Sequence, residues 1–121
     1  MKMLKRVLVV EDEQTIAELI QNLLETEGFE VVAARNGQEA LDRLPNQPID
    51  LILSDIMMPY MDGWQLCNYL QDHPAYRHIK LILMSAAKPD KPNNGCEYTA
   101  FIEKPFALEQ LLEIIMQYTY D

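Results

Sequence analysis

The sequence has few basic residues and no long apolar run. Ten lysines and arginines stand against 19 aspartates and glutamates, which gives a formal net charge of -9. Because affinity for nucleic acid comes mainly from cations that neutralise phosphates, this balance argues against direct nucleic-acid binding. No apolar run approaches the roughly 20 residues needed to cross a bilayer, and the short run near the N-terminus ends in acids instead of a signal-peptide cleavage region. We expect a cytoplasmic protein that binds neither nucleic acid nor membranes.

Cysteine is equally scarce, and its spacing excludes the common metal and redox motifs. The two cysteines, Cys67 and Cys96, form no C-x-x-C pair, and no histidine lies at ligand spacing from them. We therefore expect no zinc site and no redox motif, and we expect both side chains to be reduced thiols in the core or on the surface. With 121 residues that are 49% hydrophobic, the chain can form one domain whose core needs no disulfide or metal.

The order of the apolar runs predicts an α/β fold. Five short runs have the length of strands, and apolar residues at helical spacing lie between them. The expected strands span residues 6–10, 30–35, 51–54, 79–84 and 99–103, and the expected helices span residues 14–27, 37–44, 63–72 and 107–118. Strands that are apolar at nearly every position are typical of a parallel sheet covered on both faces. With right-handed crossovers, we expect a doubly wound five-stranded parallel sheet in the order 2-1-3-4-5, with ligands bound beside the carboxyl ends of the first and third strands.

One connection departs from this regular alternation. The segment between the fourth and fifth strands contains Pro89, Pro92 and Gly95. Proline removes a backbone donor and glycine costs about 1 kcal/mol relative to alanine in a helix, so a regular helix is disfavoured here. We expect a short, irregular or missing fourth helix, and a mobile segment over residues 88–97.

Polar residues follow the expected strands at the edge where ligands of such sheets bind. These residues are Glu11 and Asp12 after the first strand, Asp55 after the third, Ser85 after the fourth and Lys104 after the last. Each one alone has an ordinary explanation as a helix cap, a turn residue or a surface charge. In the expected strand order they converge, and this joint placement indicates a functional site.

The chemistry of these residues points to phosphoryl transfer. Carboxylates brought within a few ångströms repel one another, and each close pair costs on the order of several kcal/mol at an effective dielectric of about 20. Oxygen-only ligands with room for water suit Mg²⁺ rather than zinc. One oxygen of Asp55 could then attack phosphorus, as carboxylates do in aspartyl-phosphate chemistry. Lys104 would neutralise charge, and the Ser85 hydroxyl would donate to a phosphoryl oxygen.

Four motifs carry a resemblance to a known family. They are VLVVEDE, LILSDIMMPYMDGW, LILMSAA and FIEKPF, in this order. Over essentially its full length the sequence resembles the receiver domains of bacterial two-component response regulators, and in particular the chemotaxis-type single-domain receivers. The resemblance implies a flavodoxin-like fold, one domain over residues 1–121 with no output domain, and Asp55 as the phosphoacceptor. It also implies Glu11 and Asp12 as the acidic pair, and Met57 as the donor of a backbone carbonyl to Mg²⁺.

The same resemblance implies a switching mechanism and its partners. Ser85 takes the place of the family's switch hydroxyl, Lys104 that of its phosphate-pairing lysine, and Phe101 that of its switch aromatic. Plain strand packing stays equally open for Phe101. The bond between Lys104 and Pro105 is expected to be a cis peptide, because the free-energy difference between cis and trans is small before proline. A sensor histidine kinase or a histidine phosphotransfer protein would supply the phosphoryl group, and a downstream protein target would read the result. The domain would assist its own phosphorylation and dephosphorylation without being an enzyme in the ordinary sense.

Residues beside the expected phosphoryl site suggest slow dephosphorylation. Met57 and Ala87 are apolar where many relatives carry groups that orient water. We therefore hypothesise a comparatively long-lived phosphoryl group on Asp55.

Three other functions were weighed against this one. Phosphatases of the haloacid dehalogenase type need a second acid two residues after the nucleophile, and that position here is Met57. A flavin-binding domain would need a Ser/Thr/Gly-rich loop after the first strand, where this chain has EDEQT. A phosphorylation-independent interaction module with the same fold stays open.

Overall fold

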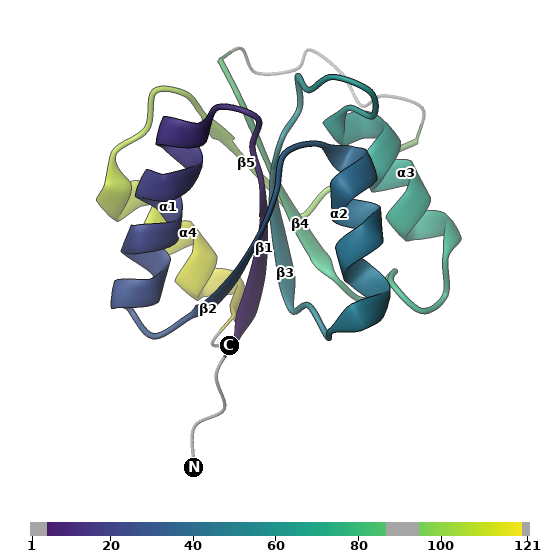
Figure 1. Ribbon diagram of the computed structural model, residues 1–121, viewed down its shortest axis with the longest axis horizontal. Helices are drawn as coiled ribbons and strands as arrows, with labels where there is room; N and C mark the ends of the chain where they lie inside the picture. The colour runs from purple at the N-terminus through teal and green to yellow at the C-terminus, as the bar shows by residue number, and fades with distance from the viewer. Residues whose placement is uncertain (1–4, 87–94, 120–121) are drawn as a thin grey trace.

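Five parallel strands in the order β2-β1-β3-β4-β5 form the central layer of the domain (Figure 1). The computed structural model describes residues 5–86 and 95–119. The strands are β1 (Arg6–Val10), β2 (Glu30–Ala34), β3 (Leu51–Asp55), β4 (Lys80–Ser85) and β5 (Ala100–Glu103). The predicted strand order is confirmed, and every predicted strand lies within two residues of its observed bounds.

Helices cover both faces of this sheet. They are α1 (Gln14–Thr26), α2 (Gly37–Arg43), α3 (Gly63–Asp72) and α4 (Leu108–Thr119), and a short 3-10 helix (Leu44–Asn46) follows α2. Helices α1 and α4 lie on one face, and α2 and α3 lie on the other (Figure 1). No helix in the part of the chain that the structure describes has the length and apolar character required to span a membrane.

Two apolar clusters hold these layers together, one on each face. The side chains of β1 alternate between them: Leu8 and Val10 face α2 and α3, whereas Val7 and Val9 face α1 and α4. Strand β3 lies at the centre and is buried at all of its positions. Burial on both faces explains why the strands read as continuous apolar runs rather than as alternating ones.

The start of α3 packs directly against the end of β3. The Asp62 side chain accepts a hydrogen bond from the Gln65 backbone, and the Gln65 side chain accepts one from the Asp62 backbone, so the two residues form a capping box. Gly63, which follows Asp62, packs so tightly against β3 that a β-carbon there would lie 2.7 Å from the Asp55 carbonyl oxygen. The loop after β3 is therefore held at both ends, which restrains the backbone of Asp55.

The connection from β4 to β5 departs from the regular βα alternation. Its described parts, Ala86 and residues 95–99, are not helical. Most of the segment expected to be mobile, residues 88–94, lies outside the described residues, as does Ala87. Hydrogen bonding to β4 begins at Thr99, directly before β5, where the Thr99 N–H donates to the Leu81 carbonyl at 2.7 Å.

The expectation of two reduced thiols is wrong. Cys67, on the buried face of α3, forms a disulfide with Cys96, just before β5, and the Cα atoms of the two residues are 5.8 Å apart. Their sequence separation of 29 residues hides this pairing from the sequence. In the fold, the end of the β4–β5 connection passes over α3, and this brings the two sulfurs together.

Candidate functional site

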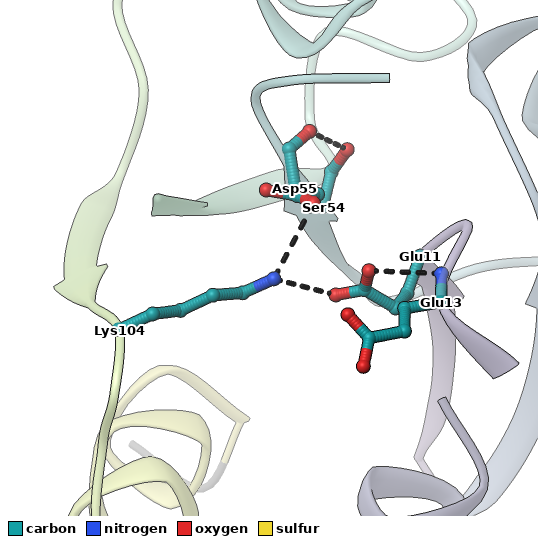
Figure 2. A network of polar contacts seen from close by, with 5 residues as sticks. All are labelled: Glu11, Glu13, Ser54, Asp55 and Lys104. Atoms are coloured by element: carbon teal, nitrogen blue, oxygen red, sulfur yellow. Dashed lines mark hydrogen bonds and ion pairs between the residues drawn. The ribbon is translucent and has the colours of Figure 1, made fainter. Parts of the chain in front are cut away.

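The polar residues at the strand ends meet at one edge of the sheet, as predicted. Strands β1 and β3 pair with Val10 opposite Ser54, so Glu11 and Asp55 come next on adjacent strands. Figure 2 shows Glu11, Asp55 and Lys104 pointing toward a common centre from three separate segments.

The three acidic residues form a compact cluster. One carboxylate oxygen from each of Glu11, Asp12 and Asp55 can be chosen so that all lie within 4.8 Å of one another. Glu11 is 3% exposed and Asp55 is 8% exposed, whereas Asp12 is open to solvent. The cluster thus has two buried carboxylates and one exposed carboxylate.

A lysine from the opposite side of the site binds two of these carboxylates. The Nζ atom of Lys104 lies 2.8 Å from Oε1 of Glu11 and 3.3 Å from Oδ2 of Asp55 (Figure 2). The Lys104 backbone N–H donates to the Ser85 carbonyl at 2.8 Å, which ties the lysine to the end of β4. The bond from Lys104 to Pro105 is cis, as the family resemblance implies.

Burial and charge together shift the pKa values of Asp55, Glu11 and Lys104. Burial raises the pKa of Asp55, and the charge and hydrogen bond of Lys104 oppose this shift without cancelling it. The pKa of Glu11 is raised by burial as well, although the hydrogen bond from Lys104 opposes this. Burial lowers the pKa of Lys104, but the hydrogen bond to Glu11 and the negative charge of Asp55 outweigh that effect and raise it. Among the described residues, the site therefore carries negative charge that Lys104 does not fully balance.

Backbone contacts orient the two buried carboxylates. The N–H of Glu11 donates to the Ala34 carbonyl at 3.0 Å, and Oε2 of Glu11 accepts from the Glu13 N–H at 3.2 Å. The Ser54 hydroxyl donates to the Asp55 carbonyl at 2.9 Å (Figure 2). The first two contacts fix Glu11 directly after β1, and the third fixes the backbone of Asp55 at the end of β3.

The donor set fits a hard divalent cation. The three side chains of the cluster offer only carboxylate oxygens, and that of Asp12 faces solvent, which leaves room for bound water. The pKa values of Glu11 and Asp55 are raised, which means that Lys104 does not fully offset the cost of burying the two ionised carboxylates. A divalent cation would supply the missing positive charge.

The remaining candidate residues lie around this centre. Ser85 is the last residue of β4, one strand away from Asp55. Phe101 is half-buried on β5 and packs against the apolar cluster beneath α2 and α3. The Met57 side chain is 74% exposed in the loop after β3. The structure thus brings Glu11, Asp12, Asp55 and Lys104 into direct proximity. Ser85, Phe101 and Met57 belong to the adjoining strands and loop.

Two features of the site are not evident from its polar residues. Gly63 is required by the close approach of α3 to the Asp55 backbone, and its only sequence signal is its place after the capping residue Asp62. A polar cavity of about 380 Å³ opens beside Glu11 and Asp12, and its walls also include Arg35. The cavity depends on how α1 and α2 lie across β2, which a sequence pattern does not specify.

Comparison with known proteins agrees with this geometry. Residues 7–116 match the response regulator receiver domain family. The polar-differentiation response regulator DivK of Brucella anthropi is 37% identical over 122 residues, which cover 97% of this chain and 98% of DivK. Among solved structures, the chemotaxis protein CheY4 of Vibrio cholerae has a TM-score of 0.90 at 25% identity, and the match covers 96% of this chain and 99% of CheY4. The response regulator protein TrrA of Thermotoga maritima, in complex with Mg(2+)-BeF, has a TM-score of 0.84 at 30% identity, with 95% and 99% covered.

Proposed function

Because the chain belongs to the family of response regulator receiver domains, which act as switches in two-component signalling, we propose that Asp55 is its phosphoacceptor. Asp55 is the one carboxylate of the cluster that ends a central strand and also contacts Lys104. The observation that carries the proposal is this shared lysine beside a cluster of three acids. Such a site can hold a reactive carboxylate and neutralise an incoming phosphoryl group at the same time.

The transfer step is an in-line displacement at phosphorus. A carboxylate oxygen of Asp55 attacks the phosphoryl group of a phosphohistidine, the new O–P bond forms, and the N–P bond to the imidazole breaks. The imidazole leaves with its electron pair and takes a proton from solvent. The ammonium of Lys104 already lies between two carboxylates, so it can form an ion pair with the phosphoryl oxygens during the transfer.

Mg²⁺ is the proposed cofactor. Glu11, Asp12, Asp55 and the backbone carbonyl of Met57 would hold it. When bound, Mg²⁺ offsets the negative charge of the acids and of the phosphoryl group. The similarity to TrrA, which was solved with Mg(2+)-BeF, supports this assignment.

The proposed partners follow from the chemistry. A sensor histidine kinase or a histidine phosphotransfer protein would supply the phosphoryl group, and a downstream protein would bind the phosphorylated surface. Ser85 would donate its hydroxyl hydrogen to a phosphoryl oxygen, and Phe101 would change its packing in response. The half-buried position of Phe101 supports such a change, because its side chain packs against the core without being fully enclosed by it.

Intact-mass measurement after incubation with acetyl phosphate and Mg²⁺ tests the proposal. One phosphoryl adduct is expected on the wild type and none on Asp55→Asn. Asp42→Asn, which removes an acid from the exposed surface of α2, is the matched control and should gain the adduct normally. An adduct on Asp55→Asn would exclude Asp55 as the sole acceptor. No adduct on any variant, with acetyl phosphate or with a phosphohistidine donor, would favour the phosphorylation-independent interaction module instead.

A further inference from the structure

The disulfide between Cys67 and Cys96 lies away from the carboxylate site and joins α3 to the segment that enters β5. Its Cα–Cα distance of 5.8 Å is the usual spacing for a disulfide, so the bond can form or break without a shift of the backbone. No other cysteine exists in the chain, so each has a single possible partner within it. We propose that Cys67 and Cys96 form a reversible thiol–disulfide site, and that its reduction by a dithiol releases residues 95–99 from α3.

Few other contacts hold this segment to α3. The Gln71 side chain donates to the Gly95 carbonyl at 3.3 Å and accepts a hydrogen bond from the Glu97 N–H. Tyr98 packs edge-on against Trp64, with ring centroids 6.0 Å apart. The disulfide is the one covalent tie among these contacts, so its loss removes the main constraint on where the chain enters β5.

Reduction also changes the surroundings of one of the remaining contacts. The Sγ atom of Cys67 lies 3.5 Å from Oε1 of Gln71. In the disulfide this sulfur carries no proton. As a thiol, Cys67 can donate to the same oxygen that accepts from the Glu97 N–H. The amide oxygen of Gln71 has two lone pairs, so it can accept from both groups, and its contact with Glu97 is one of those that remain after reduction.

Exchange requires a local opening at this site, because Cys67 is 2% exposed and Cys96 is 3% exposed. A small cavity of about 40 Å³ reaches Cys67, and its lining includes Gln71, Arg77 and Glu97. A thiolate of the dithiol attacks one sulfur, the S–S bond breaks, and a mixed disulfide forms. The second thiol of the reductant then displaces it. Two electrons and two protons pass to the cysteines, and the reductant leaves as its own disulfide. Arg77 and Glu97 both line the cavity, so the incoming thiolate meets one charge of each sign.

The exchange can affect the neighbouring core. Both cysteines belong to the apolar cluster against which Phe101 and Trp64 pack, and Phe101 follows Cys96 by five residues in the chain. Any effect on signalling through Phe101 rests on the proposed function of Asp55. The exchange itself does not, because no atom of the carboxylate site takes part in it.

Alkylation and intact mass measure the exchange. The purified full chain is equilibrated without denaturant in mixtures of reduced and oxidised dithiothreitol of varied ratio, precipitated with acid, and redissolved at neutral pH with N-ethylmaleimide. The number of adducts should rise from zero to two as the ratio increases, with the same curve from either direction and the same curve for Asp55→Asn. Two adducts at every ratio would overturn the proposal, because the bond would not form. Zero adducts until the protein is denatured would also overturn it, because the bond would not be reversible.

Hydrogen exchange tests the release of the segment. In dithiothreitol, the amides of residues 95–99 should exchange at least about tenfold faster, whereas those of β1 should not change. The double variant Cys67→Ser, Cys96→Ser should match the reduced wild type with or without dithiothreitol. If this variant does not fold, the comparison of oxidised and reduced wild type decides alone, with the emission of Trp64, the single tryptophan, as a second probe. Equal exchange rates in both redox states would overturn the proposal.

Discussion

Lys104 lies closer to Glu11 than to Asp55, with Nζ–O distances of 2.8 Å and 3.3 Å. The Glu11 side chain is 1% exposed, so the lysine serves as the main counter-charge of a buried acid before any phosphoryl group arrives. A phosphoryl group on Asp55 would compete with Glu11 for the same ammonium. The strength of the Glu11–Lys104 contact therefore affects how readily the lysine turns to Asp55.

Replacement of this lysine should destabilise the metal-free domain. Lys104→Met leaves Glu11 buried without its partner, so the free energy of unfolding at pH 7 should fall by about 1 to 3 kcal/mol. Urea unfolding followed by circular dichroism measures the change. Lys5→Met removes a charge far from the site and is the control. Equal stability of the two variants would contradict the proposed role of Lys104 as a counter-charge.

The pH dependence of stability follows from the raised pKa of Asp55. Burial is the main cause of this shift, so the folded state holds the Asp55 proton more tightly than the unfolded state does. The contribution of Asp55 to stability therefore falls as pH rises from its unfolded pKa, about 4, through its folded pKa. The group opposes folding at neutral pH. Asp55→Asn should remove this trend, which urea unfolding without metal at a series of pH values would reveal as a flatter profile. Superimposable profiles for wild type and variant would show that Asp55 does not titrate in this way.

Mg²⁺ should stabilise the domain, because it is expected to bind only the folded cluster. At a free concentration ten times its dissociation constant, the gain is about 1.4 kcal/mol. Thermal unfolding with increasing MgCl₂ measures this as a rise in the unfolding temperature. Asp12→Asn removes the exposed ligand and should abolish most of the rise without disturbing the buried contacts. A rise of the same size in this variant would mean that the ion binds elsewhere.

A methyl group at Gly63 should disturb the phosphoacceptor. A β-carbon there would lie 2.7 Å from the Asp55 carbonyl oxygen, so Gly63→Ala should cost about 1 to 3 kcal/mol and slow adduct formation with acetyl phosphate. Gly37→Ala is the matched control, since its β-carbon would meet Met61 at 2.6 Å and not Asp55. Similar losses of stability are expected from both, with slower adduct formation from Gly63→Ala alone. If both variants react at the wild-type rate, the close approach of α3 has no influence on Asp55.

A polar group at position 57 should shorten the life of a phosphoryl group on Asp55. Met57 is 74% exposed, so Met57→Asn changes little in the packing of the domain. An amide there can orient an attacking water, and one hydrogen bond worth about 1 kcal/mol corresponds to about fivefold in rate. Phosphate release from the phosphorylated proteins, timed after removal of the donor, gives both rates. Loss at an equal or faster rate in the wild type would refute the hypothesis of a long-lived phosphoryl group.

The strand order and the convergence of Asp55, Glu11 and Lys104 were predictable for a physical reason. Continuous apolar strands predict a parallel sheet, and the carboxyl ends of parallel strands lie at one edge. Polar residues directly after those strands must therefore meet. The sequence could not reveal that Lys104 lies nearer to Glu11, because this depends on side-chain distances that differ by about half an ångström.

The pairing of Cys67 with Cys96 was missed for a different reason. Helical spacing with Leu66 and Leu70 could place Cys67 on the buried face of α3. The position of Cys96, however, depends on a connection whose path has no periodic signal. Reduced thiols were the natural expectation for a chain without C-x-x-C spacing, and the tertiary path of this single connection overturned it.

The short outer strands of the sheet have a consequence for the behaviour of concentrated protein. Strands β2 and β5 lie at the two open edges and have only five and four residues. Pro105 follows β5 almost at once and has no N–H to offer another chain. With so little unpaired backbone at either margin, and with like charge on every copy, the domain resists edge-to-edge aggregation.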